Sequence, residues 1–265
     1  MFANDTITDV MTNTAQLLNN VIEDYLNYCI LDKNLARNTV KLYQYYLNDF
    51  VNWARLTKTL LYPADITADL ILKYRVYLSK KVDKNKSLKR STQNYFLVAI
   101  RGLLRYLASQ GIECLPSDRV ILGKNRDRSL KFLEIEHLQA LLAAPDLSKI
   151  SGLRDKAILE LLFSTGLRVS EAASLNRDQV NIERREFGVL GKGGKARVVF
   201  LSDEAAQQLM TYLNAREDNF RPLFIRHHGK IEEEDKGEKM RLTVRSIERM
   251  VTKYGIQAKL PITIS

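Results

Sequence analysis

The sequence contains little cysteine and no long hydrophobic run. Only two of its 265 residues are cysteine, Cys29 and Cys114, and they lack the spacing of metal ligands. We therefore expect two reduced, buried thiols in helical segments rather than a disulfide framework or a zinc site. No apolar run approaches the length of a membrane span, and the polar start around Asn4 and Asp5 is unlike a secretory signal. These absences favour a soluble, cytoplasmic protein.

Positive charge is what the sequence has in excess. Lysine and arginine number 41 against 31 aspartate and glutamate, which gives a formal net charge of +10. Residues 1–114 hold 15 basic and 10 acidic side chains, leaving 26 and 21 for the rest of the chain, so each part carries +5. The even distribution indicates a polyanionic partner held by both parts, as by a clamp on DNA, although ribosomal and membrane-surface proteins share this composition.

Hydrophobic periodicity predicts four helices in the first 111 residues, each with one buried face. We expect helix caps at Asn38 or Thr39, at Thr67 and near Ser91, because short polar side chains accept hydrogen bonds from the first helical amides. The predicted core positions are, in chain order, Leu17, Leu18, Val21, Ile22, Tyr25, Leu26 and Cys29; Leu42, Tyr46, Phe50 and Trp53; Leu70, Ile71, Tyr74 and Leu78; and Phe96, Ile100, Leu103, Leu104 and Leu107.

The rest of the chain is predicted to form a second domain. The stretch 116–128 is polar, basic and without helical periodicity, which indicates a linker. The charged segments 80–90 and 229–237 are typical of surface loops, and we do not expect the acidic residues of 229–237 to bind a metal. The predicted elements are a helix over 134–143, a β-hairpin over 187–201, a helix over 203–213, a short strand over 220–225, and a last helix over 243–254 with Val244, Ile247 and Val251 inward.

The segment Thr165-Gly-Leu-Arg168-Val-Ser-Glu171 joins two predicted helices. Glycine readily takes the positive φ of a helix C-cap, so the first helix should end at Gly166. Arg168 then lies in the first turn of the next helix, where amide groups and the helix dipole attract anions. A guanidinium fixed there can hold a phosphate through two parallel hydrogen bonds, which a lysine cannot do.

A second motif, Gly191-Lys-Gly-Gly-Lys-Ala-Arg197, has the composition of a hairpin turn, and its Lys192 follows Arg168 by 24 residues. Together the two motifs resemble the tyrosine recombinases of the phage-integrase and Xer type, and the resemblance covers residues 15–265. It implies a mainly α fold with a small β-hairpin: an N-terminal four-helix, SAM-like core-binding bundle over 1–114, a linker over 115–130, and an α+β catalytic domain over 131–265.

The resemblance also implies roles for individual side chains. Arg168 would hold the scissile phosphate, Lys192 would protonate the leaving 5′-oxygen, and Glu171 would orient the guanidinium unless it is an ordinary surface carboxylate. A 3′-phosphotyrosyl intermediate keeps the energy of the ester, so neither a cofactor nor a metal is needed. The residues expected to contact double-stranded DNA, or to be solvated surface charge, are Arg37, Asn38, Thr39, Lys89, Arg90, Ser91, Gln93, Lys195 and Arg197.

The match to the family stops short of its full catalytic set. The family also uses a His-x-x-Arg pair, a further His or Trp and a nucleophilic tyrosine, but His137, His227 and His228 do not begin such a pair. Residues 260–265 resemble the segment directly before it. We therefore expect a chain truncated in its catalytic domain and inactive alone, in which Tyr254 packs on the core and is not the nucleophile.

The two motifs favour a site-specific recombinase or integrase that is tetrameric on DNA in its full-length form. One alternative is a non-catalytic DNA-binding regulator of recombination sites. Another is a type IB topoisomerase, which shares the arginine and lysine chemistry but fits the helical N-terminal bundle less well. The sequence leaves open whether the biological role is chromosome-dimer resolution, and thus chromosome partition, or integration of a mobile element.

Overall fold

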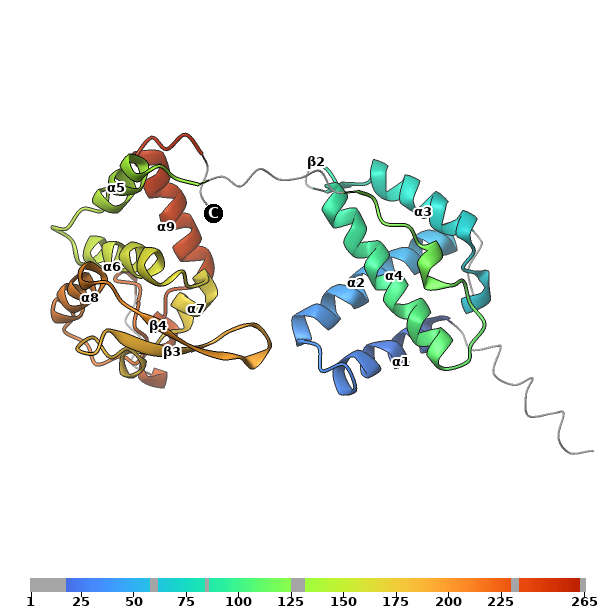
Figure 1. Ribbon diagram of the computed structural model, residues 1–265, viewed down its shortest axis with the longest axis horizontal. Helices are drawn as coiled ribbons and strands as arrows, with labels where there is room; N and C mark the ends of the chain where they lie inside the picture. The colour runs from blue at the N-terminus through green and yellow to red at the C-terminus, as the bar shows by residue number, and fades with distance from the viewer. Residues whose placement is uncertain (1–17, 58–61, 84–85, 125–131, 230–233, 263–265) are drawn as a thin grey trace, which may run out of the picture. The chain divides into compact units, whose positions relative to one another are not determined.

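The computed structural model is mainly helical, with two small antiparallel hairpins in the part of the chain that it describes (Figure 1). The chain divides into two units, Met1–Arg128 and Ser129–Ser265. These features confirm the predicted fold class, a helical bundle followed by an α+β domain. The structure describes all residues except 1–17, 58–61, 84–85, 125–131, 230–233 and 263–265.

The N-terminal unit is a helical bundle around one apolar core. The described core positions predicted for its first, third and fourth helices are all buried, whereas Leu17 lies outside the described residues. Phe50, Trp53 and Tyr74 pack ring against ring between the second and third helices. The helices are α1 (Leu18–Leu31), α2 (Arg37–Leu56), α3 (Ala68–Lys80) and α4 (Arg90–Ser109).

The buried face of α2 differs from the prediction. Leu42 is 51% exposed, while Val40 and Leu47, seven residues apart, are buried. Phe50 is buried as predicted, and Trp53 is only half-buried at the edge of the core. The buried stripe of α2 is therefore rotated away from Leu42. Aromatic residues on the flank of a helix can cover the core without lying at its centre.

Two predicted helix caps are wrong. The N-cap of α2 is Ala36 and the N-cap of α4 is Lys89, and neither side chain accepts a capping hydrogen bond. Asn38 and Thr39 instead lie inside the first turn of α2, where the Thr39 amide already donates to the Ala36 carbonyl at 2.8 Å. Both helices thus begin before the nearest side chain that could cap them. These side chains, Asn38 in α2 and Ser91 in α4, lie inside the helices.

The predicted basic loop and linker are more ordered than expected. Val82–Asp83 (β1) pairs with Lys86–Ser87 (β2) within the 80–90 segment. Past α4, Cys114 lies in a loop and is only half-buried, so it is neither helical nor buried as predicted, whereas Cys29 is buried in α1. Val120 is buried in the N-terminal core, and the backbone of Gly123 exchanges two hydrogen bonds with Asn94. The first part of the predicted linker therefore packs on the bundle.

In the C-terminal unit, helix α6 packs against α5, α7, α8 and strand β4. Its Ala157, Ile158 and Leu161 are fully buried, which places the helix at the centre of the second apolar core. The predicted hairpin is confirmed, with Leu190 opposite Ala196 next to the turn. The elements are α5 (Ile135–Ala143), α6 (Ile150–Thr165), α7 (Val169–Ser174), β3 (Glu186–Leu190), β4 (Ala196–Phe200), α8 (Asp203–Asn214) and α9 (Val244–Gln257).

The strand predicted over 220–225 is wrong. This segment makes only isolated bridges, at Pro222 and Ile225. The fully buried Arg216 side chain donates from Nη1 to the carbonyls of Pro222 and Leu223, at 3.0 and 2.8 Å. An arginine thus satisfies backbone acceptors that a neighbouring strand would otherwise pair with.

Two expectations for the last part of the chain need correction. Val244, predicted inward, is 37% exposed at the start of α9, although Ile247 and Val251 are buried as predicted. The predicted 229–237 loop contains residues 230–233, which lie outside the described residues, and its residues 234–237 belong to a 3₁₀ segment over Glu234–Met240. Among the described residues, no three His, Cys, Asp or Glu side chains are grouped as a metal site. None of the described helices is long and apolar enough to cross a membrane.

The cap of α3 provides a stability test. The Thr67 side chain accepts from the Leu70 amide at 3.2 Å, so Thr67→Ala should lower the free energy of unfolding by about 1 kcal/mol. Thr39→Ala should cost less, because Thr39 is not a cap. Urea unfolding followed by the fluorescence of the single tryptophan, Trp53, measures both. An equal loss in the two variants would contradict the cap assignment.

Candidate functional site

Helices α6 and α7 meet at a tight turn that positions Arg168. Gly166, the residue after α6, has a φ of 61°, the left-handed C-cap conformation that the sequence predicts. Arg168 is the N-cap of α7, one position before the predicted first turn. Its side chain is 62% exposed.

The carboxylate of Glu171 joins this turn to the hairpin. Its Oε2 accepts from the Arg168 backbone amide and from Arg197 Nη2, both at 2.8 Å, and its Oε1 accepts from Nη1 of each arginine at 3.1 Å. Four donors fill the acceptor positions of a carboxylate. The Glu171 side chain is only 10% exposed. It is therefore not the ordinary surface carboxylate that the sequence left open.

Charge at this cluster is distributed unevenly. Hydrogen bonds from Arg197 are the largest cause that lowers the pKa of Glu171 to about 2, so the carboxylate is ionised at neutral pH. Arg197 donates to this carboxylate from both Nη groups, whereas the Arg168 side chain donates from one. In the described part of the chain, no acceptor pairs with Nε or Nη2 of Arg168. These two donors are open to a ligand.

The turn of the hairpin carries Lys192. A hydrogen bond from the Gly191 amide to the Lys195 carbonyl, at 2.8 Å, closes the turn. Gly193 and Gly194 take φ values of 76° and 74°, which side chains other than glycine rarely adopt. Lys192 is the first residue of the turn segment Lys192–Gly194. Its side chain lies outside what the structure describes. Its chemical role stays a prediction.

The two other basic residues of the hairpin differ from each other. Lys195 is exposed, and its side chain has no partner among the described residues. Arg197, which the sequence left as a phosphate contact or a solvated charge, is paired with Glu171 instead. The structure thus brings Arg168, Glu171 and Arg197 together beside the hairpin.

In the N-terminal unit, the predicted DNA-contacting residues lie at two helix starts. Amides at a helix start lack intrahelical acceptors, so an uncapped start can donate to an anion. Gln93 is partly engaged, since its Nε2 donates to the Leu88 carbonyl at 2.8 Å. The residues are Arg37, Asn38 and Thr39 in the first turn of α2, and Lys89, Arg90, Ser91 and Gln93 at the start of α4.

Arg241 supports the site, although no sequence pattern predicted this role. Its guanidinium donates to the carbonyls of Ala173 and Leu175, at 3.1 and 2.8 Å, and to the side chain of Asn176. These bonds satisfy backbone acceptors at the end of α7, the helix that carries Glu171. One arginine among many basic residues gives no sequence signal of such a role.

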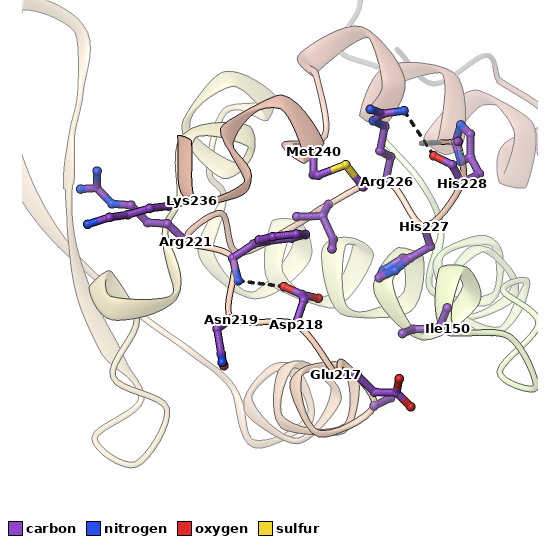
Figure 2. A pocket seen from close by; sticks show the side chains of 14 residues that line it. Ile150, Glu217, Asp218, Asn219, Arg221, Arg226, His227, His228, Lys236 and Met240 are labelled. Atoms are coloured by element: carbon purple, nitrogen blue, oxygen red, sulfur yellow. Dashed lines mark hydrogen bonds between the residues drawn. The ribbon is translucent and has the colours of Figure 1, made fainter. Parts of the chain in front are cut away.

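A separate cavity of about 920 Å³ lies beside the 217–229 segment (Figure 2). Its wall contains the cations Arg221, Arg226 and Lys236 together with the acids Glu217 and Asp218. Residues 230–233, which lie outside the described residues, connect two parts of this wall. We therefore assign no ligand to it.

His227 lies in the wall of this cavity (Figure 2). Its Nε2 is 3.0 Å from the Tyr212 hydroxyl. Burial, followed by the positive charges of Arg154 and Arg216, lowers the pKa of His227 to about 4. The histidine is therefore neutral near pH 7.

Comparison with known proteins identifies the class. The phage integrase family matches residues 131–263, and the N-terminal SAM-like domain of phage integrases matches residues 22–111. The chain belongs to the phage integrase family of tyrosine recombinases. By family it is a DNA-binding enzyme of site-specific DNA recombination.

The relatives it matches include Xer proteins. It is 30% identical over 220 residues to the tyrosine recombinase XerD of Listeria innocua, and this match covers 80% of this chain and 72% of the relative. It is 31% identical over 255 residues to XerC of Thermodesulfovibrio yellowstonii, covering 92% and 77%.

Solved structures show the same fold. A lambda integrase dimer bound to a COC′ core site matches with a TM-score of 0.66 at 13% identity, over 94% of this chain and 84% of that one. XerH bound to its difH substrate matches with a TM-score of 0.59 at 18% identity, over 91% and 69%.

The lowered pKa of His227 predicts a pH effect on stability. An unfolded histidine titrates near 6.5, so on acidification the unfolded chain binds this proton before the folded chain does. Stability contributed by neutral His227 is thus present above about pH 6.5 and is lost as the pH falls toward about 4. His227→Gln should flatten this decline in urea unfolding at a series of pH values.

The exposed neighbour provides the control. His228→Gln should keep the decline of the unaltered protein. An unchanged decline in His227→Gln would show that His227 does not cause it.

Proposed function

We propose that Arg168 holds the scissile phosphate of double-stranded DNA and that Lys192 protonates the leaving 5′-oxygen. The Arg168 guanidinium supports this role, because Glu171 holds it from one side while its Nε and Nη2 stay open. A donor fixed before the substrate binds needs no reorganisation when charge develops on the phosphate, which is the main source of electrostatic catalysis.

The proposed reaction breaks and rejoins DNA through a 3′-phosphotyrosyl intermediate. A tyrosine oxygen attacks phosphorus, the bond to the 5′-oxygen breaks, and Lys192 supplies the proton to that oxygen. The reverse attack by a 5′-hydroxyl restores the phosphodiester, so the ester energy is kept and no cofactor is consumed.

Tyr254 does not fit the role of nucleophile. It is 5% exposed and donates to Asp155 at 3.0 Å, and burial is the main cause that raises its pKa to about 12. This agrees with the prediction that it packs on the core. The 265 residues also contain no His-x-x-Arg pair. The attacking tyrosine and the second arginine of this scheme are therefore not assigned to residues of this chain.

Both units are proposed to hold DNA. The uncapped starts of α2 and α4 supply amides together with Arg37, Lys89 and Arg90, and the hairpin supplies Lys195. The charge of +5 on each part of the chain favours such a clamp. Lambda integrase has been solved as a tetramer bound to a Holliday junction, and we propose the same assembly state for this protein on DNA.

Arg168→Ala tests the phosphate contact. The variant should keep its thermal unfolding transition, because the side chain is largely exposed. The plot of log affinity for duplex DNA against log salt should become shallower by about 0.9, the contribution of one phosphate contact. Arg184→Ala is the matched control. It removes an exposed charge just before strand β3 and should keep the slope. Equal changes in the two variants would refute a specific contact at Arg168.

A further inference from the structure

Arg197 lies between the two parts of the proposed site. On one side, its two Nη groups donate to both oxygens of Glu171, at 3.1 and 2.8 Å. On the other side it covers Gly191, since a Cβ added there would lie 3.0 Å from Arg197 Nη1. Gly191 is the residue before Lys192 and closes the turn through the Lys195 carbonyl. The Arg197 guanidinium therefore lies against both Glu171, which holds Arg168, and Gly191, which precedes Lys192 in the turn.

This geometry argues against a phosphate contact at Arg197. One N–H of each Nη, the pair that can form an end-on fork to a phosphate, is donated to a carboxylate that is itself only 10% exposed. The Glu171 charge also compensates that of Arg197. Lys195 lies just before strand β4, and its exposed side chain has no partner among the described residues, so it is the better candidate for a phosphate contact on the hairpin.

The absence of a side chain at position 191 fits the same arrangement. Gly191 has φ −82° and ψ −171°, an extended conformation that any residue can adopt. Backbone strain therefore does not require glycine here. The Arg197 guanidinium lies close to this position, because an added Cβ would be 3.0 Å from Nη1 and the end of the arginine would have to shift slightly.

We propose that Arg197 is a positioning residue, which ties the Lys192 turn to Glu171 and so fixes the separation of the two catalytic cations. The inference rests on the proposed function, in which Arg168 and Lys192 act on one phosphate. It replaces the expectation that Arg197 itself contacts DNA.

Amide hydrogen exchange on the free protein tests the tie directly. Arg197→Ala should speed exchange at the Gly191 and Arg168 amides by about fivefold, the factor that corresponds to about 1 kcal/mol. Lys195→Ala, the matched control, should leave both amides unchanged. Unchanged exchange in Arg197→Ala would overturn the proposal. If that variant does not fold, Arg197→Lys carries the same test, because lysine keeps the charge but not the paired hydrogen bonds.

The salt dependence of binding to duplex DNA separates this inference from the proposed function. Arg197→Ala should keep the slope of the unaltered chain, whereas Lys195→Ala should lower it by about 0.9. A loss of about 0.9 in Arg197→Ala would make it a phosphate ligand and overturn the positioning role. If the unaltered chain shows no salt-dependent binding, the proposed function fails, and the exchange experiment, run without DNA, still decides the role of Arg197.

Discussion

The carboxylate of Glu171 is the interaction on which the site depends. It accepts four hydrogen bonds, from the backbone and side chain of Arg168 and from both Nη groups of Arg197. Without it, two guanidinium groups would face each other across the junction of α7 and the hairpin, and their repulsion would open that junction. With this carboxylate in place, the charge of Arg197 is compensated and the guanidinium of Arg168 is presented to solvent. The carboxylate thus joins two like charges and leaves one guanidinium, that of Arg168, free for the phosphate contact that we propose.

The rest of the C-terminal unit holds this carboxylate in place. The left-handed turn at Gly166 sets the start of α7, and Arg241 satisfies the carbonyls at the end of the same helix. The hairpin reaches α7 through Arg197, whose register opposite Val189 is fixed by the strand pairing. Neighbouring backbone groups are thus satisfied by arginine side chains, which lets short, irregular segments support the site without a larger sheet.

The sequence predicted several features that depend on local chemistry, although it misplaced the caps of α2 and α4, and it failed where side-chain contacts outside the local pattern decide. The Gly166 C-cap, the hairpin and the Thr67 cap follow from neighbouring residues, and the structure confirms them. Arg197 could not be assigned from the sequence, because its partner lies 26 residues away and a free arginine looks the same in a pattern. The strand predicted over 220–225 failed because the side chain of Arg216, six and seven residues before Pro222 and Leu223, has no place in a repeating pattern yet pairs with their carbonyls.

A double-mutant cycle on Glu171 tests this account most directly. The free energy of unfolding would be measured for Glu171→Gln, for Arg197→Gln and for the double variant, with Arg168→Gln in a parallel cycle. We predict a favourable coupling between Glu171 and Arg197 of about 1 kcal/mol or more, because the carboxylate is nearly buried and the pair is doubly hydrogen-bonded. The coupling to the more exposed Arg168 should be smaller. No coupling between Glu171 and Arg197 would contradict the account.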